Sequence, residues 1–560
     1  MAADQKELPG GSRLRRILPL PVVLILVLAV SLHFCLWKSG MFIDEIYTFG
    51  LSNSHNMPFI GNGEHDRIEE QLITRADFQD YLTVTDSEPA FDAVSVYTNQ
   101  VQDVHPPLHY WIINFCSSLA RGQFSKWIGL IPDLIIQAGT LVLLYLLGIE
   151  LFHDRRIAAL TALLFGLSQA GLSIVLMIRM YVLMCFWTVL LALLIAKELR
   201  APGLKKEIGI GLCIFAGLMT QYYFVFYAFF LCAVTVFVLL FRKDFRAAGR
   251  FALLAFLGVG LMLLCFPAVL TQMTGQRLGP DSDALENLKN VSAWAGRLRY
   301  YFGQIRVGLP VAVGAAVASL VVTLGPVLMR KIKPQFTGDE LRVLWLLLPV
   351  LPTVFVSALI APVVEGRYVY NIMPICVLAA GWCISVYVRC ADAPQQSAED
   401  KVQSSKFKVQ IENGKMNSEF SRRSLSWCLT LAALAVVWSL RTVPDYIYDE
   451  HREYNAIVEE HADDPCVYMT EYYAGVTQDM LQLIRFEDVY VAGDPASAGL
   501  AEYLDAENCD ECVVYIDVSD FWGSGFNAAE MLDDLLSETD YTSYEPLYHY
   551  ALSNTYLLRK

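Results

Sequence analysis

Residues 13–45 read RLRRILPLPVVLILVLAVSLHFCLWKSGMFIDE, and this stretch decides the fold class. Its apolar part, residues 17–37, is long enough to cross a bilayer, because a transmembrane helix needs about 20 apolar residues. The three arginines before it predict a cytoplasmic amino terminus under the positive-inside rule. The apolar run is too long for a signal peptide, and no small-residue cleavage site follows it. We therefore expect a retained helix that places Asp44 and Glu45 just outside the membrane.

The composition predicts many more such helices. Hydrophobic residues make up 55% of the 560 positions and charged residues only 18%, with a mean hydropathy of +0.41. Soluble domains are less apolar than this. The apolar runs predict eleven spans, near residues 17–37, 127–151, 157–177, 180–197, 207–220, 222–241, 250–270, 305–329, 340–361, 367–388 and 425–441. The basic loops then fall on one side, which predicts an integral plasma membrane protein with its carboxyl terminus outside, in contact with membrane lipids.

Residues 105–120, HPPLHYWIINFCSSLA, are apolar but break this alternation. Counting them as a span would place Arg155 and Arg156 outside. We interpret them as a short amphipathic helix on the outer interface, with Pro106 and Pro107 at its start, where proline is tolerated. A topology of twelve spans is the alternative.

The end of the chain differs sharply in charge. Residues 442–560 contain 26 Asp and Glu against 4 Lys and Arg, whereas the whole chain has a net charge of −15. Segments of strand and helix pattern alternate there, with strands expected at Cys466–Thr470, Val489–Ala492 and Val513–Asp517, helices at Val476–Ile484 and Ala528–Ser537, and a closing strand or hairpin at Leu547–Arg559. This predicts an acidic extracytoplasmic α/β domain, for which nucleic acid and anionic lipid surfaces are poor partners.

The expected domain organisation follows from these patterns. Residues 1–390 form a transmembrane module whose first outer loop, residues 38–126, is long enough to be folded and functional. Residues 391–424 are polar and predict a flexible cytoplasmic loop. Residues 425–441 form the last span, and residues 442–560 form the outer domain. Cys509 and Cys512 in that domain lack a second ligand pair, which favours a local disulfide or free thiols over a zinc site.

Five ordered landmarks resemble those of a known superfamily. They are MFIDEIYTFG (41–50), DVHPPLHYWI (103–112), IRMYVLMCFW (178–187), TQYYFVFY (220–227) and EGRYVYNIMP (365–374). In this order they resemble the GT-C glycosyltransferases, within the group of the protein O-mannosyltransferases and the lipid A aminoarabinose transferase. The resemblance covers roughly residues 15–390. It implies an integral membrane enzyme that takes a sugar from a polyprenyl-phosphate carrier, with Asp44 and Glu45 at its catalytic centre.

The chemistry of such a transfer can be argued from the residues alone. A sugar phosphodiester has a good leaving group, so the reaction needs a general base for the acceptor hydroxyl and positive charge for the phosphate. Asp44 suits the base, which typically contributes about 10² to 10⁴ in rate. Direct displacement by the hydroxyl would invert the anomeric configuration. Glu45 is then available to orient the acceptor or to bind a metal ion.

Cations at the outer ends of spans are the phosphate candidates. Arg179 and Arg367 each begin a span, and a guanidinium suits bidentate phosphate contact. Snorkelling to lipid headgroups is the alternative for both arginines. Arg297, Arg299 and His105 are second choices.

The remaining candidates for substrate binding are Asp103, His105, Tyr181, Tyr222 and Tyr368. His105 could instead be a turn residue in contact with Asp103, and the tyrosines fit an aromatic belt at least as well as a sugar platform. Together with Asp44 and Glu45, Asp103 and His105 would suit a divalent cation such as magnesium or manganese. No compact ligand motif is present, so we expect no obligatory metal.

Two other classes of function compete with a hexosyl or pentosyl transferase. A flippase or transporter for a lipid-linked sugar should place charges near the middle of the bilayer, often with internal repeats. Here the polar landmarks gather on one face, which favours an enzyme. A non-catalytic scaffold is disfavoured because the acidic pair is present. The sequence names neither the sugar nor the acceptor, which is a protein, a lipid or a glycan.

Overall fold

Two compact units make up the chain. The computed structural model describes residues 19–61, 67–277, 283–328, 340–392, 413–507, 509–519, 523–550 and 552–560. The first unit comprises Met1–Phe34, Asp133–Val175 and Met180–Asp445, and the second comprises Cys35–Pro132, Leu176–Arg179 and Tyr446–Lys560. This grouping differs from the division expected from the sequence, because the first outer loop and the acidic domain fall into one unit.

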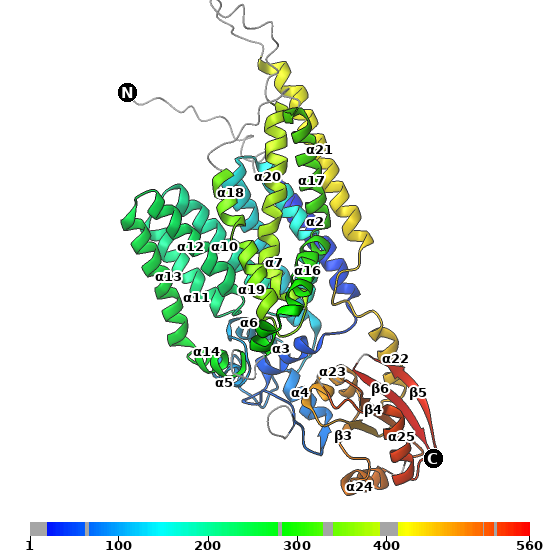
Figure 1. The fold of residues 1–560 in the computed structure, drawn as a ribbon. Helices are drawn as coiled ribbons and strands as arrows, with labels where there is room; N and C mark the ends of the chain where they lie inside the picture. The colour runs from blue at the N-terminus through cyan, green and yellow to red at the C-terminus, as the bar shows by residue number, and fades with distance from the viewer. Residues whose placement is uncertain are drawn as a thin grey trace, which may run out of the picture. The chain divides into compact units, whose positions relative to one another are not determined.

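The first unit is built from helices (Figure 1). They are α2 (Pro19–Trp37), α7 (Lys126–Phe152), α8 (Arg155–Gly166), α9 (Gln169–Leu176), α10 (Tyr181–Arg200), α11 (Leu204–Leu218), α12 (Phe224–Phe241), α13 (Phe245–Cys265), α14 (Ala268–Thr271), η1 (Gln272–Arg277), α15 (Asp283–Lys289), α16 (Val291–Gly308), α17 (Pro310–Leu328), α18 (Glu340–Leu347), α19 (Val350–Ile360), η2 (Gly366–Ile372), α20 (Met373–Asp392) and α21 (Asn413–Arg441). A few residues of α2, α7 and α9 belong to the second unit.

Many of these helices suit a membrane. Within the described residues, seven are long and apolar enough to cross one, or nine if each of two bent pairs is one span. The bent pairs are α8 with α9, at 57°, and α16 with α17, at 86°. Two of the eleven expected spans lie outside this set: α11 has 15 residues, and the apolar part of α21 is Ser426–Arg441. The chain is therefore a polytopic helical membrane protein.

Helices α11 and α13 approach each other closely within this unit (Figure 1). A Cβ atom added at Gly258 would lie 2.3 Å from the carbonyl oxygen of Gly211, so only glycine fits at this crossing. Small residues allow such close backbone packing between membrane helices. The Arg250 guanidinium also donates two hydrogen bonds of 2.8 and 2.9 Å to the Glu207 carboxylate, which joins the two helices.

The second unit combines helices with one sheet. Its helices are α3 (Ile43–Asn53), α4 (Arg75–Leu82), α5 (Ala93–Gln102), α6 (Leu108–Leu119), α22 (His451–Glu460), α23 (Tyr473–Leu483), α24 (Ala498–Glu507) and α25 (Ala528–Glu538). Its strands are β1 (Gln71–Thr74), β2 (Cys466–Met469), β3 (Asp488–Ala492), β4 (Glu511–Asp517), β5 (Ser543–His549) and β6 (Ser553–Arg559). Helix α6 has 12 residues, about 18 Å at 1.5 Å per residue, which is shorter than a bilayer crossing.

The sheet joins two distant parts of the sequence. Its strand order is β1-β3-β2-β4-β6-β5, with β2 parallel to both β3 and β4 and the other pairs antiparallel. Strand β1 comes from the first outer loop and pairs with β3 from Gln71 opposite Val491 to Thr74 opposite Asp488. The outer loop therefore supplies an edge strand of the acidic α/β domain, which the sequence analysis did not anticipate.

Helices cover both faces of this sheet. Alternate strand residues such as Val467 and Val514 pack in one core with residues of α24 and α25. On the other face the rings of Tyr468 and Tyr515 stack 5.4 Å apart, and Tyr468 donates a hydrogen bond of 2.8 Å to Asp479 on α23. Strands with a side-chain period of two form this kind of layered domain. Cys466, Cys509 and Cys512 are free thiols in this domain.

Asp479 makes the stability of this domain depend on pH. Complete burial raises its pKa to about 6 because the charged form loses solvation. The folded-state pKa lies above the unfolded one, so the free energy of unfolding falls by about 3 kcal/mol as the pH rises from about 4 to about 6. We expect Asp479→Asn to abolish this fall, measured by amide hydrogen exchange of β2 and β4 in the full chain at pH 4 and pH 6.5, corrected for the pH dependence of the intrinsic exchange rate. Asp505→Asn, an exposed substitution on α24, is the control, and an unchanged fall in the Asp479 variant would contradict this prediction.

Candidate functional site

Helix α3 carries the acidic pair in its first turn, in the second unit. The helix begins after Phe42, whose backbone N–H donates to the Glu45 carboxylate at 2.7 Å. A carboxylate three residues into a helix satisfies one of the free N–H groups at its start and complements the positive end of the helix dipole. The local sequence FIDE therefore fixes the start of the helix and places Asp44 beside Glu45.

Asp44, the predicted base, and Arg179, a predicted phosphate-binding cation, lie together in the structure. The Asp44 Oδ2 atom is 3.7 Å from an Arg179 guanidinium nitrogen. The Asp44 side chain is 20% exposed, whereas that of Arg179 is only 4% exposed. Arg179 also donates hydrogen bonds to the Tyr110 hydroxyl at 2.9 Å and to the Thr48 hydroxyl at 3.3 Å. The guanidinium is thus fixed in place, and the carboxylate beside it is accessible.

Asp103 and His105 form a second pair next to this one. The His105 Nδ1 atom lies 2.8 Å from Asp103 Oδ2, with both side chains largely buried. Burial alone would raise the pKa of Asp103, but His105, through its charge and hydrogen bond, and Arg179, through its charge, lower it below its ordinary value. Asp103 is therefore a carboxylate within the electrostatic reach of Arg179. The contact between His105 and Asp103 matches the turn interpretation offered from the sequence.

Glu45 points away from solvent, in contrast to Asp44. Its side chain is 0% exposed and pairs with Lys38, Nζ to Oε2, at 3.0 Å. Its other oxygen, Oε1, accepts a hydrogen bond of 2.9 Å from the backbone N–H of Ile178. Both oxygens are thus engaged, so metal binding by Glu45 would require these bonds to break.

Three neighbouring residues were missed in the sequence analysis. Tyr110 has no sequence signal beyond its place in the second landmark, although its hydroxyl accepts a hydrogen bond from Arg179. His109 is completely buried, and burial together with the charge of Arg179 lowers its pKa to about 3, so its imidazole is neutral at physiological pH. Lys38 directly follows the first span, where a basic residue on the outer side runs against the positive-inside rule. A basic residue on the outer side of the span was the sequence signal that could have identified Lys38.

Buried asparagines hold the other end of α3. The side-chain amide of Asn99 donates to the carbonyl oxygen of Ser54 at 3.0 Å, and that of Asn114 donates to the carbonyl oxygen of Ser52 at 2.8 Å. The last carbonyls of a helix have no partner within the helix, so these amides satisfy them. The helix that carries Asp44 is therefore fixed at both ends.

The outer loop also contacts the carboxyl ends of the parallel strands. Just beyond β2, the Glu471 carbonyl oxygen accepts from the backbone N–H of Ile68 at 3.0 Å, and the Glu471 carboxylate pairs with Arg67 at 2.8 Å. The ring of Phe59 stacks on that of Tyr473 at 5.8 Å. Ligands of open α/β sheets usually bind at this edge. Here segments of the outer loop occupy it.

The other predicted substrate-binding residues lie in the first unit. The Arg367 guanidinium lies 2.7 Å from the Glu365 carboxylate and over the ring of Tyr368. The Tyr181 ring packs edge-on against Tyr370 at 5.9 Å. The Tyr222 hydroxyl hydrogen-bonds to Gln272 at 2.5 Å. The second-choice Arg297 donates to the carbonyl oxygen of Ala358 at 2.6 Å and so holds the end of α19.

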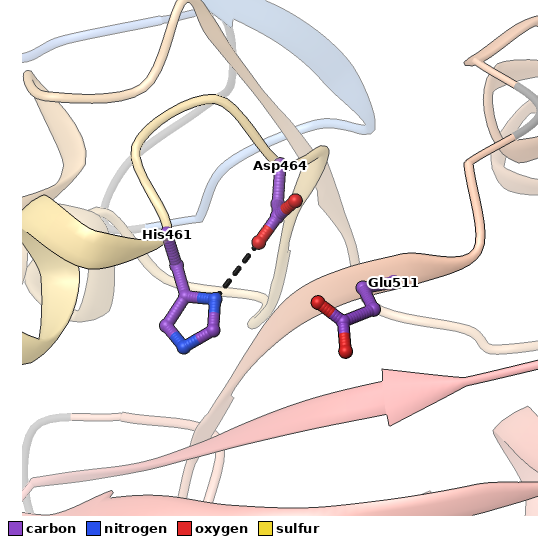
Figure 2. A group of neighbouring side chains, drawn as sticks. All are labelled: His461, Asp464 and Glu511. Atoms are coloured by element: carbon purple, nitrogen blue, oxygen red, sulfur yellow. Dashed lines mark hydrogen bonds and ion pairs between the residues drawn. The ribbon is translucent and has the colours of Figure 1, made fainter.

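A group of possible metal ligands occurs elsewhere in the second unit. Among the described residues, His461, Asp464 and Glu511 bring their ligand atoms within 4.8 Å of one another (Figure 2). The His461 Nδ1 atom lies 2.8 Å from Asp464, and Glu511 accepts a hydrogen bond of 2.8 Å from Arg559. An arginine on one of the three ligands opposes cation binding, because the two positive charges repel each other. The group is therefore better explained by its hydrogen bonds within the domain than by a metal site.

Comparison with known proteins supports the resemblance noted in the landmarks. Residues 104–271 match the model of the dolichyl-phosphate-mannose-protein mannosyltransferase family. No curated protein sequence matches the chain significantly.

Several solved structures match this chain, with TM-scores below 0.5. ArnT from Cupriavidus metallidurans, bound to undecaprenyl phosphate, has a TM-score of 0.48 at 11% identity, with 96% of this chain and 97% of that chain covered. Arabinosyltransferase EmbB from Mycobacterium smegmatis has a TM-score of 0.42 at 12% identity, with coverage of 80% and 41%. The Archaeoglobus fulgidus oligosaccharyltransferase has a TM-score of 0.40 at 12% identity, with coverage of 89% and 68%.

The family match includes the landmarks at 178–187 and 220–227 and all but the first residue of the landmark at 103–112. It thus contains Arg179 and its partner Tyr110, while Asp44 and Arg367 lie outside the matched segment. The match confirms that this chain resembles the GT-C glycosyltransferases, in the group related to the protein mannosyltransferases.

Proposed function

We propose that this chain is an integral membrane glycosyltransferase that moves a sugar from a polyprenyl-phosphate donor to an acceptor hydroxyl on the outer face. The observation that carries the proposal is the pairing of a partly exposed carboxylate, Asp44, with a buried guanidinium, Arg179, at 3.7 Å. A base and a phosphate-binding cation must belong to the same site, because the bond that forms and the bond that breaks share a single anomeric carbon. The matched family is named for dolichyl phosphate mannose, which is a donor of this chemical class.

The reaction is a single displacement. The Asp44 carboxylate accepts the proton of the acceptor hydroxyl as the hydroxyl oxygen bonds to the anomeric carbon. The bond between that carbon and the phosphate oxygen breaks, and the lipid monophosphate leaves with the electron pair. Because attack and departure are on opposite sides, the anomeric configuration inverts.

Arg179 stabilises the charge that develops on the phosphate. Its guanidinium is already oriented by Tyr110 and Thr48, so little reorganisation is needed as the charge grows. Asp103 lies within the field of Arg179, and Asp103 and His105 are candidates to bind the acceptor or the donor sugar. Arg367, Tyr368, Tyr181 and Tyr222 are further candidates for donor binding. A divalent cation is not required by this scheme, since Arg179 supplies positive charge.

The test is transfer of radiolabelled sugar from a panel of polyprenyl-phosphate hexoses and pentoses. Membranes that contain the wild-type chain are incubated with each donor and a crude acceptor fraction, and lipid monophosphate release is measured alongside. We expect one donor to be consumed, with the label moving to the acceptor. Consumption of no donor would contradict the proposal and would favour a flippase or a scaffold.

A further inference from the structure

Lys38 and Glu45 form a fully buried ion pair beside the proposed catalytic carboxylate. Both side chains are 0% exposed, and Nζ lies 3.0 Å from Oε2. Burial lowers the pKa of Lys38, and the charge and hydrogen bond of Glu45 oppose that shift. Removing two charges from water is costly, so a pair of this kind persists only where further hydrogen bonds satisfy both groups.

Those further bonds are present, and they connect separate parts of the second unit. Lys38 Nζ donates to the carbonyl oxygen of Tyr446 at 2.7 Å and lies over the ring of Tyr448 at 5.4 Å. Glu45 accepts from the backbone N–H of Phe42 at 2.7 Å and from that of Ile178 at 2.9 Å. The pair therefore joins the end of the first span, the start of α3, the segment 176–179 and the beginning of the acidic domain.

The hydrogen bond from the Ile178 N–H to Glu45 affects the position of Arg179. Ile178 precedes Arg179 directly, so a carboxylate that holds its N–H also fixes the backbone from which the guanidinium projects. Glu45 follows Asp44 directly in α3. A single side chain thus sets the distance between the two groups that the proposed reaction requires.

We infer that Lys38 and Glu45 act as a buried latch that positions Arg179 against Asp44, with Glu45 a positioning residue rather than a base or a metal ligand. The inference rests on the proposed function, because it assigns a role to these residues in the same reaction. A base must reach the acceptor hydroxyl, and a buried carboxylate with both oxygens engaged does not. Positioning has large effects, since a misplacement of about 1 Å can lower a rate about 10²-fold.

Two double variants separate positioning from charge. In Lys38→Met with Glu45→Gln, both charges are removed together, and the glutamine carbonyl still accepts the Ile178 N–H, whereas the Phe42 N–H loses its acceptor in this variant as it does in the alanine variant below. We expect kcat to fall by less than about tenfold, with an unchanged pH profile. In Lys38→Met with Glu45→Ala, the Ile178 N–H loses its partner. We expect kcat to fall by about 10²-fold, with little change in KM for the acceptor.

The single variants report on the pair itself. Lys38→Met alone leaves a buried carboxylate without its counter-ion, and Glu45→Gln alone leaves a buried ammonium. Each single variant should lower the thermal unfolding midpoint more than the Lys38→Met, Glu45→Gln double variant does. Additive effects in this cycle would overturn the latch.

The kinetic outcomes are equally decisive. A folded Lys38→Met, Glu45→Gln variant that loses more than about 10²-fold in kcat would show that the Glu45 charge takes part in the reaction, and equal rates for the two double variants would remove the role of the Ile178 bond. Failure of the proposed function is distinguished by the wild type, which would then consume no donor. In that case the thermal cycle still decides whether the latch exists.

Discussion

Replacement of Asp44 with asparagine is expected to lower sugar transfer by about 10² to 10⁴, because asparagine keeps the shape of the side chain but does not accept the proton of the acceptor hydroxyl. The loss should be in kcat, with KM for the donor nearly unchanged, because the amide occupies the same volume beside Arg179. The measurement is steady-state transfer with the donor identified from the panel, at equal amounts of folded enzyme. If proton transfer is the step affected, the remaining activity should also lose the acid limb of the wild-type pH profile.

The matched control for this variant is Asp86→Asn. Asp86 lies in the same outer loop, its side chain is 99% exposed, and its contact is an ion pair of 3.3 Å with Arg121. Exposed ion pairs contribute little to stability, so this control should behave as the wild type. Transfer by Asp44→Asn at the wild-type rate would exclude Asp44 as the base and make Asp103 the next candidate for that role.

Replacement of Arg179 with glutamine is expected to lower kcat by about 10² to 10³, the cost of losing one preorganised donor to a developing anion. The guanidinium is buried and oriented by Tyr110, so no nearby water replaces it without reorganisation. Arg179→Lys keeps the charge but not the planar fork, and its activity should lie between those of the glutamine variant and the wild type. The measurement is transfer at saturating donor, together with binding of the lipid monophosphate product.

The same variant has an electrostatic consequence that can be checked separately. Burial favours the protonated form of Asp103, and His105 and Arg179 oppose it through their charges. Without Arg179 the pKa of Asp103 should rise, so infrared difference spectra should show its carboxyl group protonated up to a higher pH than in the wild type. Arg67→Gln is the control, because Arg67 is an exposed guanidinium of the same loop whose side chain is 63% exposed. Equal loss of activity in both variants would contradict a specific role for Arg179.

Membrane topology predicted Asp44 and Arg179 on the same side of the membrane, but the sequence did not predict their contact. Each residue lies at an end of an apolar run, and counting runs places the two ends on the same side. The landmarks then favoured these positions over other boundary residues. Asp103 and His105 are close in the chain, so their contact needed no long-range information.

The different roles of Asp44 and Glu45 could not be predicted in the same way. Adjacent residues on a helix point about 100° apart, and the sequence does not say which of them faces the interior. The structure makes Asp44 partly exposed and buries Glu45 against Lys38 and Ile178. Only the packing of the segment 176–179 on α3 decides that difference.

By itself, the sequence determined the helical membrane character of the chain and the α/β pattern of its acidic end. Both are local properties, since hydropathy and side-chain period are read within a window of one element. The tertiary structure alone decided that β1 of the outer loop completes the sheet of the acidic domain, and that Lys38 and Tyr446 meet at the start of α3. Those contacts join residues hundreds of positions apart. They form because the free backbone groups of an edge strand and a buried charge need hydrogen-bond partners. This need can be recognised in the sequence, but the residue that meets it is decided only by the tertiary structure.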